Sequence, residues 1–150
     1  MKSFVFTLAF FLTLSLRTLA DDPTTTAKLT KVTETVQSKF AQGFAGAENV
    51  TWEITDKFQK AFFKKNGIYF TAFYNLKDEF VATTHHVTWN ALPLKSLHRI
   101  GKIYRGYRIK SVIQYTNQEK VYFVNLEKKN KQLLVQVQPD QNVTLFKRLQ

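Results

Sequence analysis

The residues from Phe44 to Trp52 read Phe-Ala-Gly-Ala-Glu-Asn-Val-Thr-Trp, and they decide the predicted fold because a related stretch begins sixty positions later at Tyr104-Arg105-Gly106. At this offset Trp52, Ala61 and Phe63 fall on Val112, Val121 and Phe123. After one hairpin the offset grows by three, so that Phe70, Ala72, Tyr74 and Phe80 fall on Leu133, Val135, Val137 and Val143. A pattern that recurs at a fixed period indicates one supersecondary unit that is used again.

Each unit begins with an amphipathic helix. The first has apolar residues at three- and four-residue spacing and ends at the glycines 43 and 46, and the second opens at Leu92-Pro93 and ends at Gly106. The two apolar stripes are Leu29, Val32, Val36 and Phe40, then Leu94, Leu97, Ile100, Ile103 and Tyr104. We therefore expect two helices, each with one buried stripe.

Four strand-like segments follow each helix. In the first, Trp52 and Ile54 alternate with polar residues, and Asn66-Gly67 is a strong signal for a two-residue hairpin. The expected strands cover residues 50–55, 58–64, 68–74, 80–89, 109–115, 120–126, 132–138 and 143–149.

The predicted fold class is α+β. Two tandem repeats, residues 29–89 and 90–150, each consist of a helix and a four-stranded antiparallel meander, and they share one sheet with the helices on one face. Each unit, at near 50 residues, is too small to form a stable domain easily by itself. We therefore expect the two units to share one core. Residues 29–150 are thus one predicted domain.

The first residues are typical of a secretory signal. Lys2 supplies a positive charge, an apolar stretch runs from Phe4 to Leu16, and a small residue, Ala20, precedes Asp21. Residues 1–20 are the predicted signal peptide and residues 21–28 a flexible leader. A retained membrane anchor is the alternative, although the apolar run is shorter than the roughly 20 residues that span a bilayer.

The order of short motifs along the chain resembles a family. These are the Phe44–Trp52 stretch, Ala61-Phe62-Phe63, Leu92-Pro93 and the run Tyr104–Ile109. They are similar to the PepSY-like, β-lactamase-inhibitor-like exported proteins of Gram-negative bacteria. The resemblance implies a periplasmic or secreted protein that binds or inhibits another protein and has no established enzyme activity. Where the family's turns hold an Asp-Gly-like pair, this chain has Lys77-Asp78-Glu79 and Gln141-Asn142.

The repeat alignment sorts the strand residues onto two faces. One face is apolar and should lie under the helices, and it includes Val121 and Phe123. The other mixes polar residues such as Glu53 and Lys60 with large aromatic rings, namely Phe62, Tyr69, Phe73, Tyr115 and Tyr122. Exposed rings on an uncovered face often mark a protein-binding site, so we predict that these five bind the partner. Cross-strand pairing that stabilises an open sheet is the alternative role.

Charge is concentrated in the second half. Residues 91–150 carry twelve Lys and Arg against three Asp and Glu, whereas residues 21–90 carry eight of each. Such asymmetry favours an acidic partner, so an envelope protein that binds anionic lipid or polyanion surfaces is the alternative function. A solvated surface that aids solubility is the simpler reading. The predicted basic patch consists of Lys95, Arg99, Lys102, Arg105, Arg108 and Lys110.

Other chemistry has little support in the sequence. The chain has no cysteine and three histidines, and His85 and His86 are neighbours that a regular strand points to opposite faces. No catalytic triad context, paired carboxylates or phosphate-binding loop is apparent. We therefore expect no enzyme activity, no metal and no cofactor, and we expect no nucleic-acid partner because no recognition motif accompanies the charge.

Overall fold

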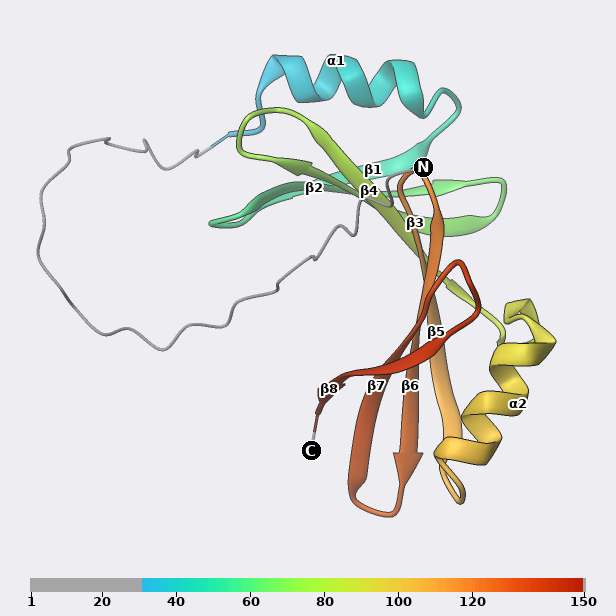
Figure 1. Ribbon diagram of the computed structural model, residues 1–150. Helices are drawn as coiled ribbons and strands as arrows, with labels where there is room; N and C mark the ends of the chain where they lie inside the picture. The colour runs from blue at the N-terminus through green and yellow to red at the C-terminus, as the bar shows by residue number, and fades with distance from the viewer. Residues whose placement is uncertain (1–30, 150) are drawn as a thin grey trace, which may run out of the picture.

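The computed structural model describes residues 31–149. Within them the chain forms two α-helices, a short 3-10 helix and eight strands (Figure 1). The helices are α1 (Glu34–Gly43), η1 (Trp89–Ala91) and α2 (Leu94–Ile103). The strands are β1 (Glu48–Ile54), β2 (Phe58–Lys65), β3 (Ile68–Asn75), β4 (Phe80–Val87), β5 (Arg108–Thr116), β6 (Lys120–Lys128), β7 (Lys131–Val137) and β8 (Val143–Arg148). The predicted signal peptide and leader lie outside the described residues.

The predicted fold class is wrong, because the strands do not divide into two tandem meanders. They form a single eight-stranded antiparallel sheet in the order β1 to β8, so the sheet is one uninterrupted meander. The ladder between β4 and β5 joins residues 83–87 to residues 112–116 without a register shift, whereas the ladders on either side of it each contain one. Periodicity along the chain reports which residues share a face and does not report which strands become neighbours.

The expected common core is also absent from the described residues. One apolar cluster lies under α1 and another under α2, and Figure 1 shows the two helices over different parts of a strongly twisted sheet. The α1 cluster contains Val32, Val36, Phe40, Ala61, Phe63, Ala72 and Tyr74. The α2 cluster contains Leu92, Ile100, Val112, Val124, Leu126, Leu133, Val135 and Val137. Because twist accumulates from strand to strand, the two ends of the sheet point in different directions and each helix covers its own end.

Local sequence explains the start of α1 and the turn between β2 and β3. The hydroxyl of Thr33 caps α1 by accepting a hydrogen bond from the backbone N–H of Val36 at 3.2 Å. The predicted hairpin at Asn66-Gly67 is confirmed, with φ angles of 51° and 80° that suit a type I′ turn.

Candidate functional site: the uncovered sheet face

Strand pairing identifies the residues that share the face away from the helices. Directly paired residues point to the same side of a sheet, and successive residues of one strand point to opposite sides. One row of paired residues crosses five strands and contains Phe62, Thr71, Thr84, Tyr115 and Val121. The neighbouring row on the other side contains Ala61 and Ala72, which lie in the α1 cluster. We call the side with Phe62 and Tyr115 the uncovered face.

Four of the five predicted binding residues lie on this face. Phe62 is 38% exposed and Tyr69 is 71% exposed, while Phe73 and Tyr115 are half-buried. Tyr69 pairs with Lys64, whose ammonium lies 5.8 Å from the centre of the tyrosine ring. These four rings are therefore available to a molecule that lies across the sheet.

Tyr122 is the exception among the predicted binding residues. It pairs with Gln114 and Val137 and packs against the α2 cluster, so it lies on the helix side. The alignment carried the sixty-residue offset into β6, but the helix-side residues Ala61 on β2 and Val124 on β6 are 63 positions apart, because β5 and β6 form a longer hairpin than β1 and β2. A shift by an odd number of residues moves every side chain of a strand to the opposite face. Val121 and Phe123, which were expected in the core, accordingly lie on the uncovered face.

Sequence reasoning missed three rings that belong to this site, namely Phe58 on β2, Phe123 on β6 and Phe146 on β8. Phe123 lies between Tyr115 and Phe146, with ring centres 6.3 Å and 5.0 Å apart, and both contacts are edge-on. Phe146 is 36% exposed. The signal was present in the turn: a connection of only residues 117–119 places Thr116 opposite Lys120 and therefore Ile113 opposite Phe123.

The rings fall into two groups with polar residues between them. The β2–β3 group contains Phe58, Phe62, Tyr69 and Phe73, in which the rings of Phe58 and Phe73 meet edge-on at 5.8 Å. The second group contains Tyr115, Phe123 and Phe146. Between them lie Thr71, Thr84 and His86. Phe62 and Tyr115 are three strand spacings apart, which is about 14 Å. The face thus offers two apolar anchors that flank a row of hydroxyl and imidazole groups.

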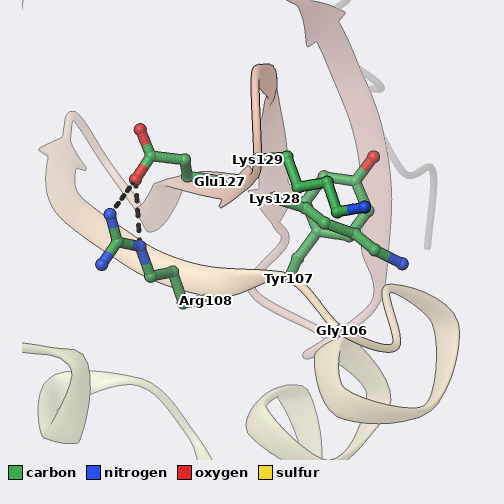
Figure 2. A pocket seen from close by; sticks show the side chains of 6 residues that line it. All are labelled: Gly106, Tyr107, Arg108, Glu127, Lys128 and Lys129. Atoms are coloured by element: carbon green, nitrogen blue, oxygen red, sulfur yellow. Dashed lines mark hydrogen bonds and ion pairs between the residues drawn. The ribbon is translucent and has the colours of Figure 1, made fainter.

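The residues of the predicted basic patch lie on α2, in the connection after it and at the start of β5. Lys95, Arg99 and Lys102 are exposed on α2, where the guanidinium of Arg99 donates to the side chain of Asn142. Arg108 and Lys110 extend instead from β5 toward Glu127 on β6, with distances of 3.0 Å and 3.2 Å from their nitrogens to its carboxylate. Figure 2 shows Arg108 beside Glu127, and Lys128 beside the ring of Tyr107.

The charges around Glu127 favour its ionised form. Hydrogen bonds from Arg108 and then from Lys110 lower the pKa of the Glu127 carboxyl below its usual value. The carboxylate therefore stays charged and keeps both cations on the β5–β6 ladder. Arg105, the remaining residue of the predicted patch, is exposed, and its carbonyl accepts a hydrogen bond from the Lys128 ammonium at 3.3 Å.

The two adjacent histidines lie on opposite sides of β4. His85 faces the helix side, where its ring lies 4.7 Å from that of Phe70, and desolvation lowers its pKa, with smaller contributions from His86 and Lys120. Within residues 31–149, no three His, Asp or Glu side chains gather in a way that would hold a metal ion. In the same range no helix has the length and apolar character required to span a membrane.

Comparison with solved structures shows what the fold resembles. A DUF2874 family protein from Bacteroides uniformis superposes with a TM-score of 0.72 over 79% of this chain and 91% of its own, at 14% identity. A BLIP-like protein from Bacteroides fragilis gives 0.68 over 78% of this chain and 86% of its own, also at 14% identity. A protein from Bacteroides eggerthii, described provisionally as periplasmic, gives 0.71 at 14% identity and covers 79% of this chain and 90% of its own.

Identities this low establish similarity of fold alone. No family model and no curated protein matches the chain. The structural neighbours agree with the β-lactamase-inhibitor-like part of the expected resemblance, and none of them carries the PepSY-like name. The fold is therefore BLIP-like.

Proposed function

We propose that this chain is an exported, non-enzymatic binding module, with inhibition of another protein as one form of that role, and that the uncovered face holds the partner. The observation that carries the proposal is the pair of aromatic groups on a sheet face that no described helix covers. Buried aromatic side chains dominate the energy of many protein interfaces, and rings that are already fixed on strands lose little entropy when a partner binds.

The arrangement of the face supports a protein partner. Each aromatic group is an apolar anchor, and the residues between them (Thr71, Thr84 and His86) supply hydrogen-bonding groups that can contact a polypeptide backbone. The strong twist of the sheet, visible in Figure 1, suits a protruding segment of a folded partner better than a flat surface. The BLIP-like neighbour makes β-lactamases the first proteins to test.

The compartment is part of the proposal. The order of charge, apolar stretch and small residue in residues 1–20 favours export, with cleavage near Ala20 to give a periplasmic or secreted protein. The provisional description of the Bacteroides eggerthii neighbour as periplasmic supports the same compartment.

A pair of matched variants tests the face. In the first, Phe62→Ala is combined with Tyr69→Ala, which removes two exposed rings. The control is Ile68→Ala, which removes an exposed apolar side chain (46% exposed) from the position before Tyr69 on the same strand. Both proteins, with the wild type, are used to capture partners from periplasmic extract and to titrate a panel of β-lactamases.

We expect the double variant to lose about 30-fold or more in affinity for a captured protein, because two anchors are removed, while Ile68→Ala stays within about threefold of the wild type. Equal binding by all three proteins would contradict the assignment of the site. Urea unfolding of the same variants tests the alternative role, in which the rings stabilise the open sheet by cross-strand pairing. If that is their main role, the double variant unfolds at a much lower urea concentration than the control.

A further inference from the structure

One end of the molecule brings together cations from segments far apart in the sequence. The last turn of α2 and the start of β5 contribute residues 102–110, and the β6–β7 hairpin contributes residues 127–131. Together these segments hold seven Lys and Arg residues and one acid, Glu127. We call this region the basic end, and its cations are Lys102, Arg105, Arg108, Lys110, Lys128, Lys129 and Lys131, all exposed.

Lys128 holds the two segments together. Its ammonium donates to the carbonyl of Arg105 at 3.3 Å and lies 5.7 Å from the centre of the Tyr107 ring. Gly106 leaves room for this contact, because a Cβ at that position would lie 3.0 Å from the Lys128 nitrogen. The basic end is thus built by tertiary contacts, whereas the patch predicted from the sequence ran through α2 and past it to Lys110 and lacked the hairpin residues Lys128, Lys129 and Lys131.

Most of this charge is not neutralised. Glu127 pairs with Arg108 and Lys110. Lys102, Arg105, Lys129 and Lys131 have no carboxylate within ion-pair distance in the part of the chain that the structure describes. Like charges held this close repel one another, so an anionic surface that supplied phosphate groups would relieve the repulsion.

An exposed apolar side chain lies within the same region. Ile103, expected in the buried stripe of its helix, is 57% exposed, and it lies between Lys102 and Arg105 in the chain. The half-buried ring of Tyr107 follows a few residues later. A soluble polyanion gains nothing from contact with an isoleucine. A lipid surface accepts both an apolar side chain and an amphipathic tyrosine at its interface.

We propose that the basic end docks on an anionic lipid surface, where the free cations contact lipid phosphates and Ile103 enters the boundary with the acyl chains. This goes beyond the proposed function and does not depend on it, because the two regions are different parts of the surface. The basic end lies where the β6–β7 hairpin comes near the last turn of α2 (Figure 1). The aromatic groups lie on the uncovered face of the sheet. Docked by its end, the protein keeps the aromatic groups free for a partner.

Co-sedimentation with vesicles tests the proposal. The wild type is mixed with phosphatidylcholine vesicles that contain about a third phosphatidylglycerol, or none, in about 0.1 M and about 1 M salt, where charges are screened over about 10 Å and 3 Å. The basic-end variant combines R105Q, K129Q and K131Q. Its matched control combines K31Q, K65Q and K77Q, which removes the same charge elsewhere. A further variant, Ile103→Ser, removes the apolar contact, and circular dichroism checks that each variant is folded.

We expect binding to the anionic vesicles alone, weakened strongly by salt. The basic-end variant should bind on the order of 100-fold more weakly at low salt, while the charge-matched control changes much less. Ile103→Ser should lower binding several-fold at both salt concentrations, since an apolar contact is not screened. Equal losses in the basic-end variant and the control would show that net charge alone acts and would overturn the proposal. Binding to soluble polyphosphate without binding to vesicles would overturn it in favour of a soluble polyanion.

Discussion

Thr84 on β4 pairs directly with Tyr115 on β5, and this pairing makes the uncovered face continuous. On one side of the pair Thr84 adjoins Thr71 and then Phe62, and on the other side Tyr115 adjoins Val121. The chain between the two strands forms α2, so the residues on either side of this ladder are far apart in sequence. The two aromatic groups consequently belong to one surface even though their clusters in the core are separate.

Separate cores predict additive effects on stability. Val36 is fully buried under α1 and Val124 is fully buried under α2, and the two residues belong to different clusters. We expect Val36→Ala and Val124→Ala each to lower the free energy of unfolding by about 1 to 3 kcal/mol. The double variant should show the sum within about 0.5 kcal/mol, as residues without shared contacts do. Urea unfolding measures all three, and a coupling above about 1 kcal/mol would indicate a common core.

Asp78 connects the β3–β4 turn to the start of α1. Its carboxylate accepts hydrogen bonds from the side chains of Thr33 at 2.8 Å and Gln59 at 2.7 Å, and Gln59 is fully buried. Asp78→Ala leaves the Gln59 amide without this acceptor, so we expect a loss of about 2 to 3 kcal/mol in the free energy of unfolding.

Backbone strain at Asp78 is measured by a second variant. Asp78 has a φ of 63°, which glycine adopts without cost and alanine does not. Asp78→Gly should therefore be more stable than Asp78→Ala by about 1 kcal/mol. A glycine variant that is no more stable than the alanine variant would indicate that the turn relaxes. Comparison of urea midpoints decides between the two.

His85 should make stability depend on pH near neutrality. Desolvation first, and then the charges of His86 and Lys120, lower its pKa in the fold below 6.5. The unfolded chain therefore binds a proton more readily, so this contribution to stability is fully present above pH 6.5 and decreases as the pH falls toward the folded value. We expect His85→Gln to reduce the loss of stability between about pH 7 and pH 5, and His86→Gln to keep the larger part of it, because desolvation is the main cause of the shift. An unchanged pH profile in His85→Gln would contradict this role.

Much of the local structure follows from the sequence. Alternation at Trp52 and Ile54, the Asn66-Gly67 hairpin and the positive φ of Gly46 and Gly106 just after the two helices each report a local preference that the fold keeps. Two turns lack the Asp-Gly-like pair of the resembled family and still form hairpins, because Asp78 and Gln141 adopt the positive φ that glycine would supply.

Two features needed information that the pattern does not contain. The pairing of β4 with β5 depends on how the chain returns through α2, which no periodicity encodes. The face of β6 depends on how far the β5–β6 hairpin extends before its turn, so an offset that was three residues too short placed Tyr122 on the uncovered face and removed Phe123 from it. The basic end likewise depends on a contact between Lys128 and Arg105, which are 23 positions apart.

Site-specific photo-crosslinking tests the central claim most directly. A photoreactive phenylalanine analogue replaces Tyr69 or Phe146 on the uncovered face, or Leu94, which is 84% exposed on α2. After irradiation in periplasmic extract, we predict that Tyr69 and Phe146 yield adducts with the same discrete protein, and that Leu94 yields none with it. Adducts with that protein from Leu94, or no adduct from either position on the uncovered face, would contradict the account.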